Sequence, residues 1–179
     1  MPNTFVYSDP HFGHQGVCKF TKSDGITPLR PWDTAEEMDE AMVKLYNDVV
    51  RPKDKIYFLG DVVIGRRHLE TMGRLNGDKI LVKGNHDIFK LDDYLKYFRD
   101  IRAYQIMNNI VMSHIPIHES SKGRFSGNIH GHMHSNSLPD PWYLCVCVEQ
   151  TGFKPIPLEE AYKRLHQQQN DVQFNSDGV

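Results

Sequence analysis

Short apolar segments of this chain run directly into polar clusters rich in aspartate, asparagine and histidine, and this arrangement limits the folds open to it. In open α/β sheets, ligands bind beyond the carboxyl ends of the strands. Clusters that follow strand-like segments therefore predict one site, assembled at a sheet edge. The five clusters are Asp9-Pro10-His11, Gly60-Asp61, Gly84-Asn85-His86-Asp87, Ser113-His114 and Gly131-His132-Met133-His134.

Each cluster by itself also fits a structural interpretation. Asp-Pro and Gly-Asn are common turn pairs, and a histidine at a strand end can be satisfied by a local hydrogen bond. The pair His132 and His134 is more informative, because two imidazoles two residues apart can face one point from an extended loop. A purely structural explanation would have to apply separately at each of five strand ends. The five clusters taken together therefore favour a shared chemical site.

The size and charge of the chain fit an ordinary globular protein. Its 179 residues suit a single domain, which we place at 1–169, followed by a flexible tail at 170–179. The net charge of −2 argues against a broad electrostatic surface for extended nucleic acid. No apolar stretch approaches the roughly 20 residues of a membrane span. The first residues do not resemble a signal peptide, so we expect a cytoplasmic protein that does not bind membranes.

The cysteines are expected to be buried thiols. Cys145 and Cys147 alternate within the strand-like segment 144–148, so both would point to one face. A reducing compartment keeps such thiols free. We favour this interpretation over a metal or redox role for these cysteines and for Cys18.

Strands alternate with helices early in the chain and dominate later, which predicts an α/β layered domain with a mixed sheet. Thr34 and Glu37 form a capping-box pattern that begins a helix, and Pro52 marks its end. Residues 12–33 are expected to form a loop. The other predicted elements are strands at 4–8, 56–59, 79–82, 102–107, 110–113 and 143–148, and helices near 66–75, 90–98 and 158–168.

The chemistry of the clusters indicates bound metal. Imidazole, carboxylate and amide oxygen suit Mn²⁺, Fe, Zn²⁺, Co²⁺ and Ni²⁺. No cysteine stands near a cluster in the sequence, which excludes a structural four-cysteine zinc site. The candidates are too many for one ion with an open catalytic position, and they suit two ions that share a carboxylate. They are Asp9, His11, Asp61, Asn85, His114, His132 and His134.

The five clusters, in this order, resemble the pattern of the calcineurin-like metallophosphoesterases, which is D-x-H, GD, GNH[DE], H and GHxH. The segments 143–149 and 151–156 also resemble the closing strand and turn of that family. The resemblance implies an α/β fold, a four-layer α/β/β/α sandwich of two mixed sheets flanked by helices. Small members from bacteria and phages have segments similar to Phe12-Gly13-His14 and Arg30-Pro31-Trp32.

The resemblance also implies roles for individual residues. His86 would lie beside the scissile phosphate, stabilise its charge and help protonate the leaving oxygen, and Asp87 would orient the His86 ring. Gly84 would allow the tight backbone turn that brings them forward. One metal would be held by Asp9, His11, Asp61 and His134, and the other by Asp61, Asn85, His114 and His132, with Asp61 as the bridge.

The activity implied is metal-dependent hydrolysis of phosphate esters, with phosphodiesters favoured, by a bridging hydroxide that attacks phosphorus in line. The expected cofactors are two divalent transition-metal ions, with Mn²⁺ first and Fe, Zn²⁺, Ni²⁺ or Co²⁺ as alternatives. The expected partner is a small phosphorylated substrate, for which a nucleotide is one candidate. A nuclease, a non-catalytic metal-binding scaffold and a metal-storage or sensing protein remain alternatives. A protein phosphatase is disfavoured by the short chain, and the oligomeric state is open.

Several residues outside the clusters have two interpretations each. His14 could contact substrate or form a local hydrogen bond, and His118 could line the pocket. Arg30 could bind phosphate, and Trp32 could stack on a base, although packing is favoured for Trp32. Lys122, Arg124 or the pair Arg66-Arg67 could bind a second phosphate or the leaving group, with solvated surface charge as the default for each. His130 is expected to be packed, and His68 and His166 are expected to be exposed.

Overall fold

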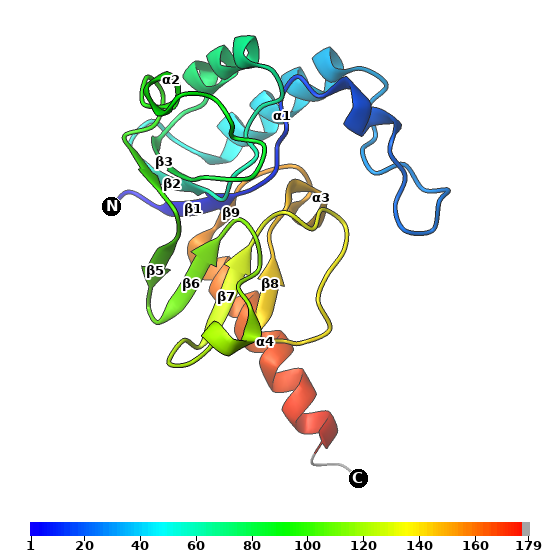
Figure 1. Ribbon diagram of the computed structural model, residues 1–179, viewed down its shortest axis with the longest axis vertical. Coiled ribbons are helices and arrows are strands. Elements are labelled where there is room, and N and C mark those ends of the chain that lie inside the picture. The colour runs from blue at the N-terminus through cyan, green and yellow to red at the C-terminus, as the bar shows by residue number, and fades with distance from the viewer. Residues whose placement is uncertain (177–179) are drawn as a thin grey trace.

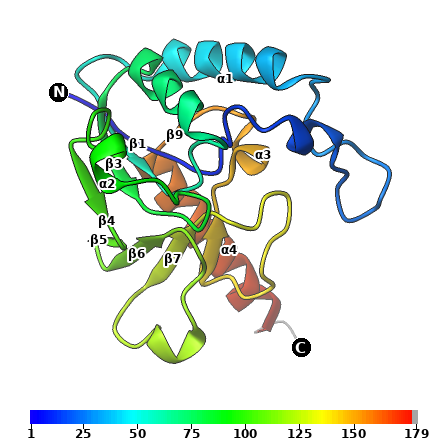
Figure 2. The same ribbon diagram turned by 45° about the horizontal axis from the view of Figure 1, so that its top comes forward.

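The computed structural model describes the backbone of residues 1–176 and the side chains of residues 1–172. Its larger sheet has the strand order β4-β3-β2-β1-β9 (Figure 1; β4 is labelled in Figure 2). The first four strands are mutually parallel and β9 is antiparallel to β1. These strands are β1 (Thr4–Tyr7), β2 (Lys55–Phe58), β3 (Asp78–Val82), β4 (Asp100–Arg102) and β9 (Ile156–Pro157).

The smaller sheet has the order β5-β6-β7-β8 and is built from the second half of the chain. Strand β5 runs antiparallel to β6, and the other pairs are parallel. Both sheets are therefore mixed, which confirms the predicted α/β fold of two mixed sheets. The strands are β5 (Gln105–Met107), β6 (Ile110–Ser113), β7 (Gly127–His130) and β8 (Tyr143–Cys145).

Alternation along the strands divides the larger sheet between two hydrophobic cores. Phe5 and Tyr7 of β1 face the helices, while Val6 faces the smaller sheet. On that inner side Val6 belongs to the same buried cluster as Met112 of β6 and Ile129 of β7. The two sheets are therefore held together by apolar burial between their facing surfaces.

Helices flank both sheets (Figures 1 and 2). Helix α1 (Ala35–Val49), the 3₁₀ helix η2 (Arg66–Arg74) and α2 (Leu91–Tyr94) contribute buried residues to the core on the outer side of the larger sheet. Helix α4 (Leu158–Ser176) contacts β1, β7, β8 and β9. The shorter helices are η1 (Gln15–Lys19), η3 (Glu119–Ser121) and α3 (Val148–Thr151).

The element boundaries follow the predictions closely at α1 and less closely elsewhere. The Thr34 side chain accepts a hydrogen bond from the Glu37 backbone N–H at 3.2 Å, which confirms the N-cap. The predicted loop at 12–33 contains η1, and β8 ends earlier than predicted because the chain turns into α3. Helix α4 continues to Ser176, past the predicted end at residue 168, so 170–176 are helical; residues 177–179 of the predicted tail lie outside the described residues.

None of the helices in residues 1–176 has the length and apolar composition needed to cross a membrane.

The carboxyl ends of the central strands meet at one edge. In the larger sheet, Tyr7 pairs with Phe58 and Phe58 with Leu81, so β1, β2 and β3 end side by side. An isolated parallel bridge between Ser8 and Cys147 then joins the end of β1 to the chain that follows β8. The two sheets therefore present their carboxyl ends to a common site.

Candidate functional site

Backbone hydrogen bonds tie the polar clusters together where the strands end. The Asp9 N–H donates to the Gly60 carbonyl at 3.1 Å, and the His11 N–H donates to the Asp61 carbonyl at the same distance. In the smaller sheet, the Gly131 N–H donates to the His114 carbonyl at 2.9 Å. The clusters are thus extensions of the sheet hydrogen bonding, which fixes the positions of their side chains.

Most of the predicted ligands have an unusual backbone conformation. Five of the seven have positive φ angles between 50° and 70°, a region that residues with a side chain seldom adopt. Such conformations cluster at functional sites, where the surrounding structure imposes them. The five residues are Asp9, His11, Asp61, His132 and His134.

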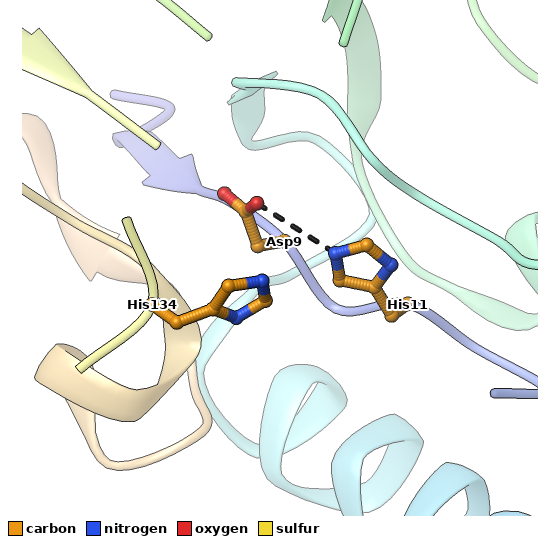
Figure 3. Close-up of side chains that lie close together, drawn as sticks. All are labelled: Asp9, His11 and His134. Carbon is orange, nitrogen blue, oxygen red and sulfur yellow. Dashed lines mark ion pairs between the residues drawn. The ribbon is translucent and has the colours of Figure 1, made fainter. Parts of the chain in front are cut away.

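The first ligand group consists of Asp9, His11 and His134 (Figure 3). Candidate ligand atoms of the three residues all lie within 4.8 Å of one another. His11 Nε2 lies 3.7 Å from Asp9 Oδ1, and the rings of His11 and His134 stack with centroids 5.2 Å apart. The three side chains therefore converge on one point.

Several polar atoms of this group are buried without a partner. Among the described side chains, Asp9 Oδ1 and both ring nitrogens of His11 are buried and accept or donate no hydrogen bond. Buried polar groups are nearly always satisfied, and each exception calls for an explanation such as a bound ion. The donor set of carboxylate and imidazole, left unsatisfied in this way, fits a divalent metal ion.

The second ligand group consists of Asp61, His114 and His132, again with candidate ligand atoms within 4.8 Å of one another. Asn85 joins it, because its Oδ1 lies 2.7 Å from His114 Nε2 and 2.9 Å from His132 Nδ1. His114 Nδ1 lies 2.7 Å from the Leu59 carbonyl, to which it must donate. When His114 is neutral, its Nε2 is therefore unprotonated, and the lone pair of Nε2 faces Asn85 Oδ1, which is also an acceptor. A cation bound between these two atoms would remove the repulsion between their lone pairs.

Asp61 lies between the two groups. Its Oδ2 is 3.6 Å from His11 Nε2 and 3.4 Å from His114 Nε2, while its Oδ1 accepts the His86 backbone N–H at 2.8 Å. Burial alone would raise the pKa of Asp61, but in the absence of an ion a protonated His114 beside this carboxyl outweighs the effect of burial and holds the pKa below its usual range. One oxygen of an ionised carboxylate is therefore available to both groups.

Two buried residues that the sequence pattern does not reveal support the first ligand group. Glu149 Oε1 lies 3.0 Å from His134 Nδ1, which leaves His134 Nε2 to face the site. The Arg30 guanidinium pairs with the same oxygen at 2.8 Å and donates to the carbonyls of Asp9 and Pro10 at 2.7 Å and 2.6 Å. Arg30 and Glu149 are at most 1% exposed, so the suggestion that Arg30 binds phosphate is wrong.

The predicted role of Asp87 is also wrong. Its carboxylate is fully buried and accepts hydrogen bonds from the backbone N–H groups of Asp61 and Gly84 at 2.8 Å and of Val62 at 3.0 Å. Asp87 therefore holds two ligand loops together, whereas the His86 ring lies exposed at the rim. Gly84 is needed for close approach rather than for a turn, because a Cβ there would overlap the Asp61 side chain.

The remaining candidates have structural explanations. The His14 side chain accepts the Val17 N–H at 3.1 Å and caps η1, and the His118 side chain caps η3 through Ser120. Arg124 is exposed and lies over the Phe125 ring. His130 and Trp32 are packed and His166 is exposed, as expected, whereas His68 is half-buried instead of exposed. Each of the other cations has a polar neighbour: Arg66 pairs with Asp93, Lys122 pairs with Asp140, and Arg67 Nε lies 3.1 Å from His68 Nε2.

The cysteines are free and largely buried, as predicted, but one lies closer to the site than the sequence suggests. Cys147 Sγ lies 3.2 Å from Asp9 Oδ2, and the His134 N–H donates to the same sulfur at 3.2 Å. Ser8 Oγ also donates to Asp9 Oδ2, at 2.5 Å. These contacts hold the Asp9 carboxylate so that its other oxygen faces the first ligand group.

Two pockets open beside the ligands and share no lining residue. One, of about 420 Å³, lies between the 20–29 segment and the loop that carries His132 and His134. The other, of about 380 Å³, includes Asn85 and His114 in its wall. The ligands are thus buried on one side and accessible on the other, as a site that acts on a bound molecule requires.

Comparisons with known proteins agree with this geometry. The family model described as calcineurin-like phosphoesterase matches residues 3–174. An uncharacterised protein of Methanocaldococcus jannaschii is 31% identical, and the match covers 92% of each chain. The gene 66 protein of a Mycobacterium phage is 33% identical over 92 residues, which cover 49% of this chain and 41% of the phage protein. A solved protein of unknown function from Aquifex aeolicus has a TM-score of 0.67 at 25% identity, covering 91% of this chain and 99% of that one.

The family match spans all five polar clusters and both ligand groups that the fold brings together. The family implies divalent metal ions and hydrolysis of phosphoester bonds, and the donor atoms found at the sheet edge fit such ions. This chain is a metal-dependent phosphoester hydrolase that belongs to the calcineurin-like phosphoesterase family.

Proposed function

We propose that this protein hydrolyses phosphodiesters with two divalent metal ions, one for each ligand group. The observation that carries the proposal is the position of Asp61, whose Oδ2 lies within 3.6 Å of an imidazole nitrogen in either group. Such an oxygen is suited to bridge two ions. The ligands would be Asp9, His11, Asp61 and His134 for one ion, and Asp61, Asn85, His114 and His132 for the other.

Bound divalent ions would supply positive charge to the phosphate and lower the pKa of water at the site. Imidazole and oxygen donors suit divalent transition metals, and we propose Mn²⁺ as the bound ion, with Fe, Zn²⁺, Ni²⁺ and Co²⁺ as alternatives. The three free cysteines suit a reducing compartment, so we place the protein in the cytoplasm.

His86 would protonate the leaving oxygen. Its ring lies at the exposed rim with its centroid 5.5 Å from that of the buried His11 ring. The His86 backbone N–H donates to Asp61, which ties the position of the ring to the shared carboxylate. A histidine at this place can reach a phosphate held over the ligands and transfer a proton to it.

The two pockets support a diester over a monoester. A diester carries substituents on two phosphate oxygens, and each substituent needs space beside the ligands. The pocket next to His132 and the pocket next to His114 provide space on two sides. The expected substrate is a small phosphodiester, since the net charge of −2 does not favour extended nucleic acid.

The test compares hydrolysis of bis-para-nitrophenyl phosphate and para-nitrophenyl phosphate by the same preparation. The protein is first treated with a chelator and then supplied with Mn²⁺, Fe²⁺, Zn²⁺, Ni²⁺ or Co²⁺, and bound metal is counted by mass spectrometry. Asp61→Asn removes the charge of the proposed bridge, and Asp33→Asn, at an exposed position, is the matched control.

We expect two ions per chain, faster hydrolysis of the diester, and loss of both ions and turnover in Asp61→Asn only. A single ion per active chain would overturn the two-metal assignment. Faster hydrolysis of the monoester would overturn the diester assignment while leaving the metal assignment intact. Two tightly bound ions without turnover of either ester would favour the non-catalytic alternative.

A further inference from the structure

We propose that the pocket beside Asn85 and His114 binds the nucleoside of a nucleotide phosphodiester, and that Lys83 binds the next phosphate of that substrate. This inference rests on the proposed function and specifies its substrate class. The pocket measures about 380 Å³, and its wall also includes Tyr104, Ile115 and Ile117.

The pocket has an apolar surface that the fold does not use. Tyr104 is 57% exposed and Ile115 is 53% exposed, although both are large and apolar. Scattered exposed apolar side chains need no explanation, but here two of them line one pocket that reaches the metal ligands. A flat base can stack on the tyrosine ring and pack against the isoleucine.

The same pocket contains an available cation. Lys83 is exposed, and its backbone N–H donates to the Arg102 carbonyl at 3.0 Å, which fixes its place at the pocket wall. Among the described side chains, no carboxylate pairs with Lys83, whereas the nearby Arg102 is paired with Asp100 at 2.7 Å. An ammonium group without a carboxylate partner at a substrate pocket is suited to a phosphate oxygen.

The wall of this pocket is continuous with the second ligand group. Asn85 and His114 belong both to the pocket and to that group, so a substituent in the pocket is attached to a phosphate at the ligands. The other pocket contains Phe20, Ser23 and Asn136 but neither lysine nor arginine. Because of the charge of Lys83, we place the half of the substrate that carries a further phosphate in the pocket beside Asn85 and His114.

Three substrates with one leaving group separate these contributions. They are the para-nitrophenyl phosphodiesters of methanol, of thymidine through its 5′ oxygen, and of 3′-phosphothymidine through its 5′ oxygen. The first has no base, the second adds the nucleoside, and the third adds one phosphate. The ratio of kcat/KM between successive substrates measures each addition and cancels any general loss of active protein.

We expect the thymidine ester to exceed the methyl ester by about 5- to 150-fold in kcat/KM, the range of base stacking on an aromatic ring. Tyr104→Ala should remove most of this ratio. The added 3′-phosphate should give a further gain of about two- to fivefold at low ionic strength, which shrinks with salt. Lys83→Met should remove only this second ratio.

Two further variants decide between the pockets. Phe20→Ala alters the exposed aromatic residue of the other pocket, and Lys90→Met removes an exposed lysine outside both. We expect both variants to keep both ratios. Loss of the thymidine preference in Phe20→Ala, with its retention in Tyr104→Ala, would place the nucleoside in the other pocket and overturn the proposal.

Measurements on the wild-type protein distinguish failure of the nucleoside pocket from failure of the proposed function. Turnover of the methyl and thymidine esters at equal kcat/KM would overturn the nucleoside pocket while supporting the proposed phosphodiesterase. Absence of turnover with all three esters, with two ions bound, would overturn the proposed function itself.

Discussion

Left-handed backbone at five of the proposed ligand positions costs free energy, on the order of 1–3 kcal/mol for each strained residue. The cost is tolerated because both ends of each loop are fixed by the sheet, as at Asp9 and His11, whose N–H groups bond to the carbonyls of Gly60 and Asp61. At these five residues, the backbone adopts a conformation that is unfavourable locally but directs the side chains of the proposed ligands toward the site.

The first prediction concerns Glu149, which touches none of the proposed ions. Glu149→Gln removes the charge that faces both His134 and Arg30, so His134 loses its orientation. We expect the affinity for one ion to fall about 10- to 100-fold, as for other residues that orient metal-binding histidines. Titration of the chelated protein against a competing metal indicator measures this.

Glu119→Gln is the matched control, because Glu119 is exposed and lies outside the site. The affinity for the second ion should be unchanged in Glu149→Gln, since Asn85, His114 and His132 do not contact Glu149. Equal weakening of both ions would indicate general destabilisation and contradict the positioning role.

The second prediction concerns His86. His86→Ala should keep two ions, because its ring belongs to neither ligand group, and lose about 10²–10³ in kcat, as when one group that stabilises a charged transition state is removed. The loss should be largest for esters with poor leaving groups, which depend most on protonation. His166→Ala, on the exposed side of α4, is the control. Unchanged kcat on a poor leaving group would exclude this role for His86.

At the scale of elements, α1 supports the first ligand loop through one buried carboxylate. Asp39 of α1 accepts the Gly13 N–H with both oxygens, at 2.9 Å and 3.1 Å. Burial raises the pKa of Asp39 to about 6 from its ordinary 3.8, although the Gly13 hydrogen bond opposes the shift. The folded state therefore holds this proton more tightly than the unfolded state.

The third prediction is the pH dependence that follows. The stability contributed by protonated Asp39 is fully present below about pH 4 and is lost as the pH rises to about 6. Asp39→Asn mimics the neutral form, so it should stabilise the protein relative to wild type by up to about 3 kcal/mol above pH 6 and much less at pH 4. Urea unfolding between pH 4 and pH 7 measures the difference, with Asp33→Asn as control. A difference independent of pH would contradict the shifted pKa.

A sequence pattern can predict the strands and the metal-ligand candidates of this protein, but it cannot predict the long-range contacts that support them. Strand periodicity and the polar residues after each strand predict the sheet edge, because both depend on neighbours in the chain. The pair of Arg30 and Glu149 joins positions 119 residues apart, and neither lies in a polar cluster. Asp87 has the right neighbours for orienting His86, but burial directs its carboxylate to backbone N–H groups instead.

At the scale of the whole molecule, the site joins the two sheets. Asp9 and Asp61 follow strands of the larger sheet, whereas His114, His132 and His134 follow strands of the smaller sheet. Ions bound by residues from both sheets would connect the sheets at this edge, where the backbone bridge between Ser8 and Cys147 also joins them. Metal content and folding stability should therefore be coupled.

The fourth prediction follows from that coupling. Saturating Mn²⁺ should raise the free energy of unfolding by about 2.7 kcal/mol for each site at 100 times its dissociation constant. Thermal unfolding with chelator and with increasing Mn²⁺ checks this, and Asp61→Asn should lose most of the increase. The same midpoint with chelator and with saturating Mn²⁺ would contradict the link between the sheets.

The antiparallel pairing of β9 with β1 also bears on the order in which the protein is made. Strand β1 leaves the ribosome before its partner on one side, Ile156–Pro157, and the other strands lie between these two in the sequence. Until then one edge of the larger sheet stays unpaired, and an unpaired edge invites association with other chains. The nascent protein therefore depends on β9 and α4, which are made after the other strands, both to close that edge and to cover the apolar surface beside it.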